Sequence, residues 1–226
     1  VINSSEQSDS RIFADKLYKE LSKTISLHAR SIRFRILAGV APFSEAKDLH
    51  HLLNMSQSVI SDVADKKIKR VAFYSPEIES RKSFLADLDS EMGRKNFVDE
   101  LKMVYQPIIN MEDRSLVGAE ALIRWKSRHF NKMIPPVDFI PVAEENGYII
   151  NIGWFVLKEV LTLISRQLKD SDLFISVNVS PMQFIESGFV DKLERLFLQY
   201  KVEKNRVKLE ITETSTASTV QLFWST

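Results

Sequence analysis

Residues 101–212 alternate short apolar segments with longer amphipathic ones, and this alternation limits the folds open to the chain. Apolar segments typical of strands occupy residues 103–109, 116–125, 173–179 and 207–212. Apolar residues at helical spacing occupy residues 136–143, 154–168 and 189–200. The polar segment 110–114 between the first two strands predicts a hairpin. Strands that alternate with helices in this way predict an α/β fold with a parallel sheet or a barrel.

The first 100 residues show a similar alternation of shorter elements. We expect a helix over 11–27, a strand over 31–40, a helix from Ser44 through Val63, and a strand over 70–74. Helix, strand, helix and strand in this order indicate half of an α/β sandwich. A charged segment follows and leads into a helix that ends near Met92. We therefore divide the chain into residues 1–76, a connector helix over 77–100, and a second domain over 101–226.

Composition excludes several classes of protein. The apolar fraction of 44% and the charged fraction of 27% are ordinary for a globular chain. Because 31 Lys and Arg residues nearly balance 30 Asp and Glu residues, bulk charge favours neither nucleic acid nor an anionic membrane. The absence of cysteine excludes disulfides, thiolate zinc sites and cysteine nucleophiles, and suits the cytoplasm. The most apolar segment, 148–164, carries Lys158 and Glu159, so we expect no membrane span.

Three polar residues lie within or at the end of apolar strands: Glu120 in GAEALIRW, Asn178 in ISVNVS, and Glu210 in KLEITET. Burying a carboxylate without a partner is costly, so each one is expected to face a cation, a donor or an open mouth. Two carboxylates and an amide oxygen suit Mg²⁺, Mn²⁺ or Ca²⁺. In a barrel, the carboxyl ends of parallel strands meet at one mouth, so ligands far apart in sequence can converge. Taken singly, each residue is more typical of a solvated or salt-bridged group.

Two further residues are candidates for substrate contact. The guanidinium of Arg124 offers a fork of donors that suits a phosphate, and the amide of Gln106 could bind a base edge. Each residue alone is more typical of a rim or a turn. The sequence contains no GxSxG, Walker or GxGxxG motif, which excludes the corresponding nucleophile-elbow and phosphate-loop mechanisms.

Four ordered motifs in the second half resemble a known family. YQPIINMEDRSLVGAEALIRW, IPPVDFIPVAEENGYIINIGWFVL, FISVNVSPMQF and VKLEITET are similar to the first half of an EAL domain, the family of cyclic di-GMP phosphodiesterases. The triplet that names the family begins at Glu120. Upstream, the ILAGVAP and RVAFY strands and the helix between them resemble, more weakly, the second half of a degenerate GGDEF domain.

The resemblance implies a fold and a site. It implies a (β/α)₈ barrel, of which this chain would hold the first strands only, preceded by part of a GGDEF-like sandwich. Glu120, Asn178 and Glu210 match the ligands of the catalytic divalent ion, Mg²⁺ or Mn²⁺, and Glu120 is the catalytic candidate. Gln106 and Arg124 match positions that contact the substrate. The implied reaction is metal-assisted hydrolysis of cyclic di-GMP to linear pGpG, with water as the nucleophile.

The ends of the sequence shape the remaining expectations. The opening VINSSEQ predicts that Val1 is the cut end of a longer cytoplasmic protein, whose membrane anchor, where it has one, would precede this chain. After Glu213 the chain reads TSTASTVQLFWST in place of the family's next motifs, so we expect no hydrolysis by this chain alone. The alternatives are a non-catalytic cyclic di-GMP receptor and a module that acts through protein contacts. A homodimer through the EAL part is a further expectation.

Overall fold

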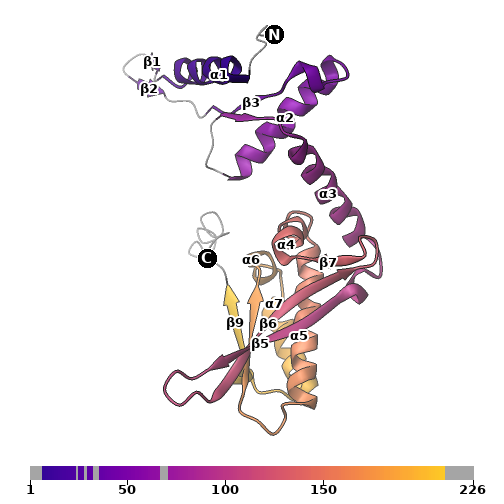
Figure 1. Cartoon of the computed structure of the whole chain (residues 1–226). Coiled ribbons are helices and arrows are strands. Elements are labelled where there is room, and N and C mark those ends of the chain that lie inside the picture. Colours follow the sequence, from indigo (N-terminus) through magenta and orange to yellow (C-terminus); the bar gives the residue numbers. More distant parts are fainter. Residues whose placement is uncertain (1–6, 24, 28–29, 33–35, 67–70, 212–226) are drawn as a thin grey trace. The chain divides into compact units, whose positions relative to one another are not determined.

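A computed structural model describes residues 7–23, 25–27, 30–32, 36–66 and 71–211 (Figure 1). The chain divides into two compact units, Val1–Phe84 and Leu85–Thr226.

The first unit contains a parallel strand pair joined by a helix. Its elements are α1 (Gln7–Leu21), β1 (Ile25–Leu27), β2 (Arg30–Ile32), β3 (Ala38–Val40), η1 (Phe43–Glu45), α2 (Leu49–Lys66) and β4 (Val71–Phe73). β3 pairs with β4 in parallel, and α2 connects them and packs against both. A side chain at Gly39 would place its Cβ 2.3 Å from the Ser56 carbonyl oxygen, so glycine is what allows α2 to approach β3 closely.

Two predictions for the first unit are wrong. The helix expected over 11–27 ends at Leu21, where the Ser22 hydroxyl donates to the Lys19 carbonyl, and residues 25–27 pair instead with β2. The strand expected over 31–40 is divided into β2 and β3, with residues 33–35 outside the described part of the chain. The hairpin between β1 and β2 satisfies the backbone of this segment locally, and helical spacing of apolar residues does not reveal it.

The expected connector over 77–100 contains two helical elements, α3 (Pro76–Met92) and η2 (Phe97–Glu100). Pro76 occupies the start of α3, and the carboxylates of Glu77 and Glu79 lie in its first turn. A proline has no amide to leave unpaired at that position, and acidic residues there interact favourably with the helix dipole. The charged segment is therefore the first part of the helix.

The second unit is a five-stranded mixed sheet with helices. Its strands are β5 (Leu101–Ile109), β6 (Leu116–Ser127), β7 (Lys132–Ile134), β8 (Phe174–Val179) and β9 (Val207–Ile211). The order is β5-β6-β8-β9, with β7 paired to β6. The predicted hairpin is confirmed as antiparallel β5 and β6, whereas β6, β8 and β9 run parallel. Its helices are α4 (Pro136–Glu145), α5 (Tyr148–Arg166), α6 (Pro181–Phe184), α7 (Phe189–Tyr200) and η3 (Lys204–Arg206).

The core of the second unit lies between the sheet and α5. Strand residues Ile175 and Val177 are buried, and α5 packs against β6, β8, α4 and α7. Helix α5 begins at Tyr148, earlier than expected. Gly147 alone separates α5 from the cap of α4, and its positive φ of 77° allows this short connection. Among the described helices α5 alone has the length and composition to cross a membrane. Half of its apolar segment is buried inside the protein.

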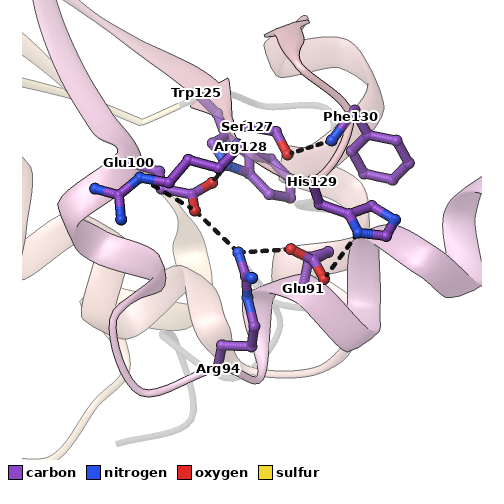
Figure 2. A network of polar contacts seen from close by, with 8 residues as sticks. All are labelled: Glu91, Arg94, Glu100, Trp125, Ser127, Arg128, His129 and Phe130. Atoms are coloured by element: carbon purple, nitrogen blue, oxygen red, sulfur yellow. Dashed lines mark hydrogen bonds and ion pairs between the residues drawn. The ribbon is translucent and has the colours of Figure 1, made fainter.

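A buried carboxylate joins the end of α3 and η2 to the sheet (Figure 2). The side chain of Glu100 is only 4% exposed and accepts hydrogen bonds from Trp125 Nε1 at 3.0 Å, the Arg128 amide at 3.1 Å and Arg94 Nη2 at 2.9 Å. Arg94 also pairs with Glu91 at 2.6 Å, and His129 Nδ1 lies 3.6 Å from the carboxylate of Glu91. The indole of Trp125 packs edge-on against Phe97. The carboxylate of Glu100 in η2 thus links the turn after α3 to the end of β6.

Burial raises the pKa of the Glu100 carboxyl, but the hydrogen bonds from Trp125 and Arg128 and the charge of Arg94 outweigh it, so the pKa lies below the ordinary value. A depressed pKa stabilises the fold above the unfolded value of about 4.3, and this stabilisation is lost as the pH falls through the folded pKa.

We expect Glu100→Gln to lower the free energy of unfolding at neutral pH by about 1–3 kcal/mol, because the amide loses the ion pair with Arg94. Acidification protonates Glu100 in the unaltered chain, so it should reduce the difference in the free energy of unfolding between the variant and the unaltered chain. Urea unfolding at neutral and acidic pH measures both quantities. Glu145→Gln, at an exposed position on α4, is the control, and equal stability losses at both pH values would contradict the expectation.

Candidate functional site

The registers of four strands bring the predicted polar residues to one face of the sheet. Gln106 of β5 lies opposite Glu120 of β6, and Glu120 lies opposite Ser176 of β8. Two residues further along β8, Asn178 lies opposite Glu210 of β9. Because strand side chains alternate between the two faces, all five residues project from the same face.

Direct contacts link these residues in pairs. Asn178 Nδ2 donates to Glu120 Oε1 at 2.8 Å, and the hydroxyl of Ser176 donates to Glu210 Oε1. Ser176 is fully buried and Glu120 is half-buried, whereas Asn178 and Glu210 are exposed. The structure therefore brings together the three residues predicted as ligands, on three neighbouring strands.

The donor set fits a hard divalent cation. Within the part of the chain that the structure describes, neither Glu120 nor Glu210 has an ion-pair partner, so both carboxylates retain oxygens available to a cation. The described residues contain no group of three His, Cys, Asp or Glu side chains that could hold a metal. The third candidate donor in this cluster is the amide of an asparagine. Asn178 would have to present its amide oxygen, which requires breaking the bond from its Nδ2 to Glu120.

The two predicted substrate contacts lie at different places around this cluster. Gln106 is exposed directly opposite Glu120. Arg124 is half-buried further along β6, opposite Lys102, and its Nη1 donates to the Ile123 carbonyl at 2.8 Å. No hydrogen bond or ion pair among the described residues joins Arg124 to the three ligand candidates, and Arg124 lines a cavity that Asn178 also borders.

This cavity of about 240 Å³ lies beside the carboxyl end of β8, and it contains polar residues that the sequence analysis missed. Arg124 and Asn178 line it together with Glu144, Ser180 and Gln183. Ser180 Oγ donates to Glu144 Oε1 at 2.7 Å, and the Ser180 amide donates to Gln183 Oε1 at 3.3 Å. The spacing of Ser180 and Gln183 is that of a capping box, a signal in the sequence that could have identified this pair.

The side chain of Gln183 packs against α5 at the position of a glycine, Gly153. Its side chain is buried, and its Nε2 has no hydrogen-bond partner among the described residues. A Cβ added at Gly153 would lie 1.5 Å from that nitrogen. The absence of a side chain at Gly153 is therefore what leaves room for Gln183 beside the cavity.

We expect Gly153→Ala to lower the free energy of unfolding by about 1–3 kcal/mol through overpacking against Gln183. The sign is informative, because alanine in place of glycine within a helix otherwise stabilises by about 1 kcal/mol. Thermal melts of the variant measure the effect, with Asn151→Ala on the exposed side of the same helix as the control. A melting temperature at or above that of the unaltered chain would contradict the clash.

The fold and the site together define an α/β protein with a polar cluster on neighbouring parallel strands, in which Asn178 and Glu210 lie near the carboxyl ends of β8 and β9. The chain belongs to the EAL domain family, which matches residues 91–224.

A curated relative aligns along most of the chain. The bifunctional diguanylate cyclase/cyclic di-GMP phosphodiesterase MucR of Pseudomonas aeruginosa is 27% identical over 222 residues, which is 95% of this chain and 32% of MucR. The chain thus spans less than a third of the length of that relative.

Solved structures show the same fold. The PaMucR phosphodiesterase in complex with c-di-GMP matches with a TM-score of 0.53 and 31% identity, over 62% of this chain and 56% of that chain. The Vibrio cholerae LapD S helix-GGDEF-EAL structure, bound to c-di-GMP, covers 98% of this chain and 52% of its own, with a TM-score of 0.53 and 12% identity. At that identity the likeness concerns the fold alone.

Proposed function

We propose that this chain forms part of a metal-dependent phosphodiesterase that hydrolyses cyclic di-GMP to linear pGpG. The observation that carries the proposal is the convergence of Glu120, Asn178 and Glu210 on adjacent strands, in a chain of the EAL family. The similarity to MucR, named as a cyclic di-GMP phosphodiesterase, supports the choice of substrate.

In this proposal the chain's residues position the substrate and a cation. Glu120, Asn178 and Glu210 hold the cation through oxygen atoms, and Arg124 offers its guanidinium to a phosphate from the neighbouring cavity. Gln106, exposed opposite Glu120, is placed to bind a base edge. When bound, Mg²⁺ or Mn²⁺ would supply a Lewis acid and lower the pKa of a water molecule. Ser176 fixes the Glu210 carboxylate, because its hydroxyl donates to Oε1.

The finer description of the fold is part of the same proposal. We assign the second unit to the first strands of a (β/α)₈ barrel, which the parallel order β6-β8-β9 with intervening helices supports. We assign residues 1–76 to a degenerate GGDEF-like domain, supported by the β3-α2-β4 crossover and by the likeness to LapD over 98% of the chain.

The surroundings of the chain complete the proposal. The absence of cysteine supports a cytoplasmic location. Val190 and Leu198 of α7 are exposed apolar side chains, and this exposure supports the proposal of a homodimer through the EAL part.

The second candidate function is a non-catalytic cyclic di-GMP receptor. One contact favours it: Asn178 Nδ2 bonds directly to Glu120 Oε1, so these two side chains are linked without a cation between them. A receptor would use the Arg124 cavity and would need no ion between Glu120 and Glu210.

We expect Glu120→Gln to lower hydrolysis of cyclic di-GMP by the full-length protein by about two orders of magnitude or more, because the glutamine keeps the size of the side chain and loses its charge. Production of pGpG is the measurement. Glu112→Gln, in the exposed turn between β5 and β6, is the matched control and should leave turnover unchanged. Unchanged turnover in the Glu120 variant would remove this residue from the site.

Binding of Mn²⁺ provides a test that does not depend on turnover. A cation that binds only the folded chain stabilises it, by about 2.7 kcal/mol when its concentration is a hundred times the dissociation constant. We expect Mn²⁺ to raise the melting temperature of the chain, and Glu210→Gln to abolish most of that rise. Glu112→Gln should retain it. An equal rise in both variants would locate the cation elsewhere and favour the receptor.

A further inference from the structure

A second concave region lies away from the site described above. It is a groove of about 620 Å³ in the second unit, between the end of α3 with η2, the first half of α5 and the start of α7. Its lining includes the cations Arg94, Lys95, Lys158 and Lys192 and the apolar residues Val98 and Phe155. No residue of this lining also lines the Arg124 cavity.

The charge of this groove has one sign. Four of its lining residues are cations, and none is a carboxylate. The charge of Arg94 is offset by Glu91 and Glu100, at 2.6 and 2.9 Å. Lys95, Lys158 and Lys192 are exposed and have no carboxylate partner among the described residues. Three lysines therefore give the groove an uncompensated positive charge.

The floor of the groove is apolar and rigid. Met92, Phe97 and Trp154 are buried, whereas Val98 and Phe155 are half-buried and leave part of their surface accessible. Trp154 has two polar contacts: its Nε1 donates to Glu186 Oε2 at 3.1 Å, and the ammonium of Lys192 lies over its ring, 4.0 Å from the centroid. The network around Arg94 similarly fixes the turn that forms the opposite wall (Figure 2).

We propose that this groove is a docking site for an acidic peptide segment of a partner protein, with a large apolar side chain inserted toward Val98 and Phe155. An apolar floor with a charged rim is the arrangement of a protein interface. Lys95 lies in the turn between α3 and η2, Lys158 on α5 and Lys192 on α7, so the three cations are spread around the groove. Cations distributed in this way match carboxylates spaced along a peptide better than they match one phosphate group. The positive rim would also accelerate encounter with an acidic partner.

The test uses the full chain and a fluorescein-labelled peptide in which glutamates flank a single tryptophan, with binding followed by fluorescence anisotropy. We expect the combined variant Lys95→Glu, Lys158→Glu and Lys192→Glu to weaken binding about tenfold or more, because each reversal replaces an attraction to the peptide carboxylates with a repulsion. The control carries Lys16→Glu, Lys19→Glu and Lys169→Glu, which change the net charge equally at exposed positions outside the groove. It should bind within about twofold of the unaltered chain.

A milder variant, with glutamine at the same three groove positions, keeps the test valid if the glutamate variant melts early. It should weaken binding by a smaller factor than the glutamate variant. Three results would overturn the proposal: equal loss of affinity in the groove and control variants, equal binding of a peptide in which glutamines replace the glutamates, or stronger binding of a single-stranded oligonucleotide than of the acidic peptide. The last result would assign the groove to nucleic acid.

Discussion

The carboxylate of Glu100 is the group on which the arrangement of the second unit depends. It accepts from the Trp125 indole, from the Arg128 amide and from Arg94, and these donors belong to the far end of β6 and to the turn after α3. A buried carboxylate with one partner removed costs about 3–5 kcal/mol, so the three segments are held together or released together. The start of β5 lies directly after Glu100, and Leu101 pairs with Trp125. The same contacts therefore fix the register of the hairpin that places Gln106 opposite Glu120.

The alternation of side chains along β8 places apolar residues on one face of the sheet and polar residues on the other. Ile175 and Val177 are buried among apolar residues, whereas the alternate positions Ser176 and Asn178 carry the polar contacts. Parallel pairing places Asn178 opposite Glu210, so one face of β8 can gather groups from both neighbouring strands. A shift of one residue in this register would turn the polar set toward the helices, where unpaired carboxylates are costly. The packing of the apolar face thus enforces the geometry of the polar face.

This dependence explains which features the sequence predicted. Alternation within ISVNVS and GAEALIRW is local, so the strands and the shared face of Glu120, Asn178 and Glu210 could be inferred. Contacts between distant segments carry no such periodic signal. Glu100 and Trp125 are 25 positions apart and Ser180 and Glu144 are 36 apart, so their bonds became visible only in the fold. The β1–β2 hairpin was missed for a related reason, because the spacing of its apolar residues fits a helix as well as a strand.

The two carboxylate clusters of the second unit are built in opposite ways. Glu91 and Glu100 are buried and are both paired with Arg94, so each carboxylate has a cationic partner inside the second unit. Glu120 and Glu210 lie on strands that flank β8, and they are linked only to the uncharged side chains of Asn178 and Ser176. Two carboxylates that share neighbours repel each other, and a fold selected for stability alone would place a lysine or arginine between them. The described residues form no ion pair with either Glu120 or Glu210, and this lack of compensation inside the second unit supports the cation site proposed above.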